Sequence, residues 1–389
     1  MATQTNYPKI TGSSLVKRFT KIYATCVKSD GTLDFSSQPT KMIWGPPGVG
    51  KSQAIVQFGH KLAQKLNKKC NITTASLLLM NPIDLRGIPT KAEDASGKLV
   101  ARWLTPEIFK MDPSNDIVNM LFLDELPSAP PSVQAATYQI ALTRCIGEHK
   151  LPDNCIVICA GNRVTDKAVA YKMPKPLGNR MTHFEMMSDV EAWIAWAVAA
   201  QVDPRIVGYI KWKPDELSTF DPKNDDVAFQ TPRSWETVDR YLKAIPEIDE
   251  AFDFIAGSIG TGAAMKFRAY TDVFMKLPNF ADIKAGKHKS LPAGVDKEHM
   301  DVLYACAAML SANVIREVNG RSSAELAKEK NFAKELDNVG KFLMLMPKEY
   351  ATATMREIFS TCRSASTAFT TCKPIMGIIK DLAEVLSEE

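Results

Sequence analysis

Residues 45–52 read Gly-Pro-Pro-Gly-Val-Gly-Lys-Ser. This stretch matches the phosphate-binding pattern Gly-x-x-x-x-Gly-Lys-Ser/Thr without a mismatch. Apolar residues 42–44 precede it, and residues 53–66 carry apolar side chains near helical spacing. The pattern therefore predicts a loop that joins a buried strand to the start of a helix, the context in which such a loop binds phosphate. A plain glycine-rich turn is the alternative, which the flanking strand and helix disfavour.

The chemistry of this loop predicts what it binds. Glycines let the backbone curl so that its N–H groups point at phosphate oxygens, and the helix N-terminus adds partial positive charge. Lys51 would reach the β- and γ-phosphates of ATP, and the Ser52 hydroxyl would ligate Mg²⁺. The residues expected to contact the nucleotide are Gly45, Pro46, Pro47, Gly48, Val49, Gly50, Lys51, Ser52 and Gln53.

The composition is that of an ordinary globular chain of two or three domains. Of its 389 residues, 45% are hydrophobic and 24% are charged. The net charge of +4 is too small to argue for nucleic acid or a membrane surface. No apolar run approaches the roughly 20 residues of a membrane span, and polar residues 1–13 lack the apolar core of a signal peptide. We therefore expect a cytoplasmic protein with no membrane partner, and a nucleic-acid partner is disfavoured.

The eight cysteines show no metal-binding or redox spacing. None forms a Cys-x-x-Cys pair, and the five histidines do not cluster near them. This pattern predicts free thiols in a reducing compartment and no protein-bound transition metal.

A second nucleotide signature follows the loop. The apolar run 117–123 ends in Asp124 and Glu125, about 70 residues after Lys51. Asp124 would hold Mg²⁺ through water together with Ser52, and Glu125 would polarise the attacking water. A Leu-Asp-Glu sequence alone usually marks a solvated strand end, but its pairing with the phosphate loop favours the functional interpretation.

Three further polar residues occupy positions expected of a nucleotide sensor or an arginine finger. Asn162 ends the apolar run 155–161 and would hold the attacking water and sense the γ-phosphate. Arg180 precedes a short strand and would reach the γ-phosphate of a neighbouring subunit. Arg233 lies in the first turn of a helix that begins at Pro232 and would reach over the nucleotide from a second domain. The alternatives are a strand-end turn asparagine, a surface arginine and a solvated helix arginine.

The rest of the chain predicts a hairpin and a helical part. Within the polar segment 90–98, residues 92–97 between apolar flanks favour the tip of a β-hairpin, with a disordered surface loop as the alternative. From Ser188 onward the apolar spacing predicts helix after helix.

In order and rough spacing, these motifs resemble those of AAA+ ATPases of the MoxR type. The matching stretches are 45–52, 121–125, 159–163, 177–180 and 231–235, together with 84–89 and 103–106. The resemblance implies an α/β P-loop core with a five-stranded parallel sheet in the order 5-1-4-3-2, then an all-α lid and a helical C-terminal extension. The implied boundaries are 1–187 for the core, with an insert at about 81–105, then 188–265 for the lid and 266–389 for the extension.

The resemblance also implies a function. Such ATPases form hexameric rings that hydrolyse ATP at subunit interfaces, and often work with a von Willebrand factor A domain partner to remodel or mature other proteins. By this likeness Lys51 and Ser52 are the Walker A residues, and Asp124 and Glu125 are the Walker B pair. Asn162 would be sensor 1, Arg180 the arginine finger and Arg233 sensor 2. Arg163 is a second arginine near the finger, so the role in trans is open between the two.

Other classes of function stay open at this point. A nucleotide-gated scaffold with slow turnover would present a surface to its partner, but Glu125 argues for hydrolysis. A nucleic-acid motor is disfavoured by the near-neutral charge and the lack of a helix-turn-helix pattern. A small-molecule P-loop kinase would not need Asn162, Arg180 and Arg233.

Overall fold

The computed structural model describes residues 7–163, 166, 171, 173–291, 299–319, 321, 325–326 and 331–362. The chain divides into two compact units. The first comprises Met1–Asp189 with Phe220–Asp225, and the second comprises Val190–Thr219 with Asp226–Glu389. The predicted division of the helical part into a lid and an extension stays a prediction.

The first unit is built on a parallel β-sheet. Among the described residues its six strands follow the order β1-β10-β2-β9-β6-β3. They are β1 (Lys9–Thr11), β2 (Lys41–Trp44), β3 (Lys69–Ser76), β6 (Ile117–Asp124), β9 (Cys155–Gly161) and β10 (Thr182–Met187). The predicted five-stranded sheet in the order 5-1-4-3-2 is therefore wrong. The added strand β1 pairs in parallel with β10, with Lys9 opposite Glu185, and its three residues are too few to show periodicity.

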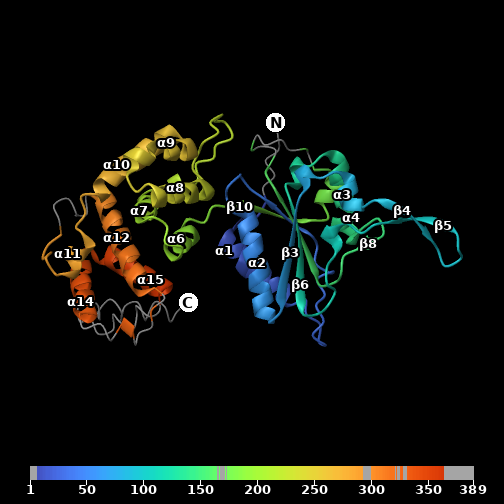
Figure 1. Ribbon diagram of the computed structural model, residues 1–389, viewed down its shortest axis with the longest axis horizontal. Coiled ribbons are helices and arrows are strands. Elements are labelled where there is room, and N and C mark those ends of the chain that lie inside the picture. The colour runs from blue at the N-terminus through green and yellow to red at the C-terminus, as the bar shows by residue number, and fades with distance from the viewer. Residues whose placement is uncertain are drawn as a thin grey trace. The chain divides into compact units, whose positions relative to one another are not determined.

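Helices cover both faces of this sheet (Figure 1). On one face lie α1 (Gly12–Ala24) and α2 (Lys51–Leu66), which share a buried core with Ile43 of β2. On the other face α3 (Pro82–Arg86), α4 (Pro131–Thr143) and α5 (Lys175–Gly178) contribute to a second core that includes Met42 and Trp44. Because both faces are covered, β6 and β9 are nearly continuous apolar runs rather than alternating ones.

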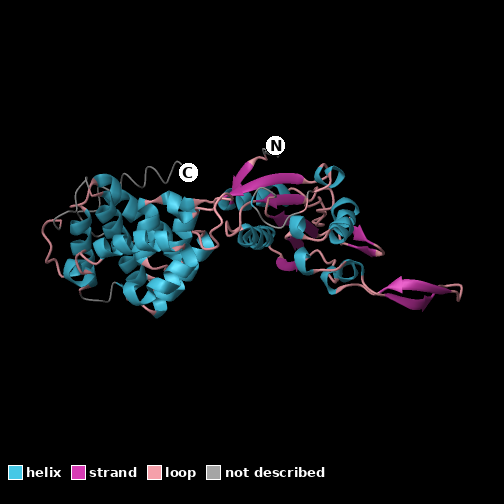
Figure 2. Ribbon diagram, turned by 90° about the horizontal axis from the view of Figure 1, so that it is seen from above, coloured by secondary structure: helices cyan, strands magenta, loops and turns pink. Residues whose placement is uncertain are grey.

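The residues of the first unit that the structure describes also form two short hairpins. The antiparallel strands β4 (Pro89–Glu93) and β5 (Leu99–Trp103) confirm the predicted hairpin, which projects from the body of this unit (Figure 2). The second hairpin, β7 (Cys145–Ile146) and β8 (His149–Lys150), was not predicted, because two-residue strands leave no alternation to detect. Short 3₁₀-helices in the described part of this unit include η1 (Leu77–Leu79), η2 (Glu107–Phe109) and η3 (Leu126–Ser128).

The described part of the second unit is helical, as predicted from Ser188 onward. Its elements are α6 (Val190–Ala199), α7 (Pro204–Trp212), η5 (Pro214–Leu217), α8 (Pro232–Ala244), α9 (Ile248–Ile259), α10 (Thr261–Phe274), α11 (Phe280–Lys284), α12 (Met300–Val318), α14 (Phe332–Leu343) and α15 (Lys348–Thr361). Their buried faces share one core, in which Tyr209 packs against Trp235 and Phe267. Among the helices of the described residues, none is long and apolar enough to cross a membrane.

Candidate functional site

The loop at residues 45–50 joins the end of β2 to the start of α2, which confirms the predicted strand–loop–helix context. Gly48 and Gly50 have φ angles of +77° and +90°, a left-handed conformation that other residues rarely adopt. A Cβ at Gly45 would lie 3.0 Å from the Met186 carbonyl oxygen of β10. Gly50 precedes α2 and brings no side-chain cap, so the first N–H groups of the helix are left for a ligand.

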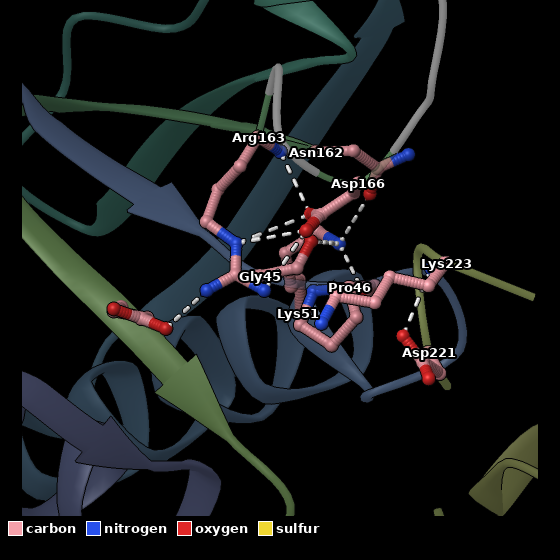
Figure 3. Close-up of polar contacts among 9 residues, drawn as sticks. Gly45, Pro46, Lys51, Asn162, Arg163, Asp166, Asp221 and Lys223 are labelled. Atoms are coloured by element: carbon pink, nitrogen blue, oxygen red, sulfur yellow. Dashed lines mark hydrogen bonds and ion pairs between the residues drawn. The ribbon is translucent and has the colours of Figure 1, made fainter. Parts of the chain in front are cut away.

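Lys51 is held at the centre of the site. Its side chain is buried, at 9% exposure, and Nζ donates to the carbonyl oxygens of Gly45 at 2.8 Å and Pro46 at 2.9 Å. The same ammonium donates to Asn162 Oδ1 at 2.9 Å (Figure 3). The structure therefore brings Asn162, at the end of β9, against the phosphate loop. A γ-phosphate bound by Lys51 would lie within reach of this amide.

Ser52 and Asp124 form the candidate magnesium position. Ser52 Oγ donates to Asp124 Oδ2 at 2.9 Å, so a hydroxyl and a carboxylate from different elements lie side by side. Both are hard oxygen ligands, and Mg²⁺ is usually bound by one or two protein oxygens together with phosphate and water. The donor set thus fits Mg²⁺. Among the described residues no group of three or more His, Cys, Asp or Glu side chains gathers as a metal site, and a magnesium ion held largely by phosphate does not need one.

Glu125 adopts an unusual backbone conformation directly after this position. Its φ of +59° is left-handed, which is uncommon for a residue with a side chain. Its Oε2 accepts a hydrogen bond of 2.7 Å from Ser76 Oγ, and Ser76 lies opposite Asp124 in the β3–β6 pairing. Ser76 was missed by the sequence analysis. The sequence does show that Ser76 is a polar residue at the carboxyl end of a strand. This position points to Glu125 only once β3 is known to pair with β6.

The end of β9 is packed tightly against the segment that follows Glu125. A Cβ at Gly161 would lie 2.1 Å from Pro127 Cδ, so no larger residue fits there without a shift of the backbone. This close approach fixes η3 against the strand that carries Asn162. It keeps Asp124, Glu125 and Asn162 at the carboxyl edge of the sheet.

Arg163 is bound within its own chain. Its Nη2 lies 2.9 Å from Asp166 Oδ1, its Nη1 pairs with Glu185, and its Nε donates to Asp166 (Figure 3). The Asp166 side chain is fully buried. A guanidinium that pairs with two carboxylates of its own subunit is poorly placed to contact a nucleotide bound to a neighbouring subunit. These contacts disfavour the alternative that Arg163 shares the role in trans.

The other two predicted arginines lie on the surface. Arg180 is exposed in the turn after α5, where its backbone N–H donates to the Leu177 carbonyl at 3.0 Å. Arg233 is exposed in the first turn of α8, whose N-terminus has a capping box formed by Thr231 and Ser234, with Pro232 as its first residue. Arg180 belongs to the first unit and Arg233 to the second. Their roles stay predictions.

A short segment from the helical part of the sequence also belongs to the first unit. Residues 220–225 group with the first unit, although η5 and α8 on either side belong to the second. Figure 3 shows Asp221 and Lys223 of this segment, with the Lys223 N–H donating to Asp221 Oδ1 at 2.9 Å. The first unit therefore includes chain from two separate stretches of sequence.

Comparisons with known proteins add a fold likeness at low identity. No protein-family model matches the chain, and no curated protein matches it. Among solved structures, it is similar to a RuvB mutant of Thermotoga maritima, with 18% identity and a TM-score of 0.35, covering 80% of this chain and 89% of that one. It is also similar to NtrX from Brucella abortus in complex with ATP, with 12% identity and a TM-score of 0.36, covering 92% and 69%. A putative ATPase from Cytophaga hutchinsonii shows 12% identity and a TM-score of 0.29, covering 94% and 88%. At these values we base the functional argument on the geometry of the site.

Proposed function

We propose that this chain is an ATP-hydrolysing AAA+ subunit of the MoxR type. The observation that carries the proposal is that polar side chains from β6, β9 and α2 converge beside the phosphate loop. Lys51 contacts Asn162, and Ser52 contacts Asp124, which Glu125 follows directly. Asp124 and Asn162 lie at the carboxyl ends of the adjacent parallel strands β6 and β9, the edge at which open α/β sheets bind ligands. Lys51 and Ser52 are the first residues of α2, which follows the neighbouring strand β2.

Each of these residues has a defined task towards Mg-ATP. The loop N–H groups and the Lys51 ammonium bind phosphate oxygens, with Lys51 exchanging its present carbonyl partners for them. Ser52 and Asp124 hold Mg²⁺, which when bound neutralises charge on the phosphates. Glu125 accepts a proton from the attacking water, and Asn162 orients that water beside the γ-phosphate.

We further propose that hydrolysis occurs between copies of this chain in a homo-hexameric ring. Arg163 pairs with carboxylates of its own chain, whereas Arg180 is exposed. Of these two arginines, Arg180 is therefore the one that can contact the nucleotide of a neighbouring subunit. Arg233 would contact the nucleotide as sensor 2. The ring would remodel or mature another protein, with a von Willebrand factor A domain protein as its partner.

One observation favours a second candidate, a nucleotide-gated scaffold with slow turnover. Ser76 Oγ donates to one oxygen of the Glu125 carboxylate, and in such a scaffold this hydrogen bond would restrain the proposed base. In a scaffold of this kind, ATP or a non-hydrolysable analogue would support partner binding and ADP would not. A remodelling ring would instead need turnover to release its client.

The decisive experiment compares wild type with Glu125→Gln. Glutamine keeps the size of the side chain but cannot accept the proton, so we expect hydrolysis to fall on the order of 10²–10³-fold while ATP binding is retained. Glu148→Gln, at an exposed glutamate in the turn between β7 and β8, is the matched control and should hydrolyse ATP at the wild-type rate. Equal rates in wild type and Glu125→Gln would remove Glu125 from the mechanism and sink the proposal.

A further inference from the structure

Two of the three acceptors that bind the Lys51 ammonium, Gly45 and Asn162, are each next in sequence to a residue whose side chain is bound to β10. Gly45 follows Trp44, whose Nε1 donates to His183 Nδ1 at 2.9 Å. Asn162 precedes Arg163, which pairs with Glu185. His183 and Glu185 are two residues apart on one strand, so they share a face of the sheet.

His183 joins this face to the turn that carries Arg180. An indole N–H can only donate, so His183 Nδ1 accepts from Trp44 and the ring proton lies on Nε2. Nε2 then donates to the Gly178 carbonyl oxygen at 2.7 Å. Gly178 ends α5 two residues before Arg180, so one imidazole contacts both the residue before the phosphate loop and the arginine turn.

The position of the imidazole ring is restricted from a third side. The Tyr7 ring stacks on His183 at 4.9 Å between centroids and on Trp44 at 5.8 Å. Both ring nitrogens are engaged and one ring face is covered, so His183 has little freedom to turn. A displacement of Trp44 would therefore be passed to the Gly178 carbonyl instead of being absorbed by rotation of the ring.

We propose that His183 is a positioning residue that links the phosphate-loop strand of a subunit to the arginine turn that the same subunit presents to its neighbour. The connection runs from Trp44, the last residue of β2, to His183, and from there through the Gly178 carbonyl along the chain to Arg180. Each step is a peptide linkage or a hydrogen bond given above. This inference rests on the proposed function, because it assumes that Arg180 acts in trans.

The first test separates rate from binding. His183→Phe keeps an aromatic ring against Tyr7 but removes both hydrogen bonds. We expect kcat for ATP to fall about tenfold, with KM and nucleotide affinity changed less than about threefold. His183→Gln supplies an acceptor and a donor and should recover most of the loss. His60→Phe, at an exposed histidine of α2, is the matched control and should behave as wild type.

A double-mutant cycle tests the Trp44 contact and guards against a misfolded variant. Trp44→Phe removes the same hydrogen bond from the other side, so alone it should reproduce part or all of the His183→Phe loss. Combined, the two substitutions should cost little more than His183→Phe alone, because they break one connection. Losses that multiply would overturn the inference, as would an unchanged kcat in both single variants.

Mixed rings show in which subunit His183 acts. A Lys51→Ala chain binds no ATP but still presents Arg180 to its neighbour. An Arg180→Ala chain binds ATP but presents no arginine finger. Rings that contain both chains should therefore hydrolyse ATP. His183→Phe added to the Lys51→Ala chain should lower the restored rate about tenfold, and added to the Arg180→Ala chain less than about threefold. Equal effects would refute the positioning role.

Two single variants separate this inference from the proposed function. If Arg180→Ala alone hydrolyses ATP at the wild-type rate, the proposed function fails. If Arg180→Ala loses hydrolysis and His183→Phe has no effect, only this inference fails.

Discussion

Lys51 and the turn that carries Arg180 belong to the same unit and have opposite surroundings. The Lys51 ammonium is buried and donates to Gly45, Pro46 and Asn162 of its own chain. Arg180 is exposed to solvent, although the backbone of its turn is held by Leu177 and His183. A cation whose partners are internal is equipped to act in cis. An exposed arginine on a turn with a hydrogen-bonded backbone is instead available to a second molecule. The following predictions test this difference.

The largest expected effect is on Arg180. We expect Arg180→Ala to lower the rate of ATP hydrolysis on the order of 10³-fold, because an arginine finger stabilises charge in the transition state. Nucleotide affinity should stay near that of wild type, since Arg180 makes no contact with the loop in its own chain. The measurement is steady-state hydrolysis across a range of protein concentrations, together with nucleotide binding by calorimetry.

Arg163→Ala is expected to lower stability, whereas Arg180→Ala is expected to lower activity. Arg163→Ala leaves the fully buried Asp166 carboxylate without its ion-pair partner, so we expect unfolding stability to fall by about 3 kcal/mol. Thermal unfolding measures that loss, and the remaining folded protein should lose far less activity than Arg180→Ala. If Arg163→Ala stays as stable as wild type and loses hydrolysis as strongly as Arg180→Ala, the assignment of the two arginines must be exchanged.

A smaller effect is expected at Ser76. Ser76→Ala removes the 2.7 Å hydrogen bond to Glu125, whose carboxylate then lacks a donor that fixes it, so kcat should fall about tenfold. Ser37→Ala, at an exposed serine in the turn before β2, serves as the comparison and should leave kcat unchanged. A rise in kcat would instead mean that Ser76 restrains the base, which is the behaviour expected of the slow scaffold.

The smallest effect concerns the cysteines and leaves activity untouched. Burial raises the pKa of Cys155, Cys159 and Cys306 to about 12, so at pH 8 about one in 10⁴ of each is thiolate. We expect a thiol-reactive reagent to leave these three unmodified in the folded protein, while the partly exposed Cys26 and Cys145 react. Peptide mass spectrometry checks this, and rapid labelling of Cys159 would show that β9 opens readily.

The long elements were predictable because their apolar patterns are strong. The run at 117–123 indicated β6, the spacing after residue 53 indicated α2, and the polar tip at 92–97 indicated the β4–β5 hairpin. The sheet was predicted with too few strands, because β1 buries little more than Ile10 and has no periodicity of its own. Its pairing with β10 depends on a partner about 175 residues away, which local pattern does not reveal.

The sequence by itself determined the phosphate loop, since a ligand site made of consecutive residues needs no knowledge of distance. It also determined which side chains stand at strand ends, among them Asp124, Glu125 and Asn162. The tertiary structure alone decided which of these meet. The order of the strands places Ser76 on Glu125 and Asn162 on Lys51, encloses Arg163 between carboxylates, and leaves Arg180 exposed. It also sets His183 between Trp44 and Gly178, because contacts across a sheet depend on which strands are neighbours rather than on their separation along the chain.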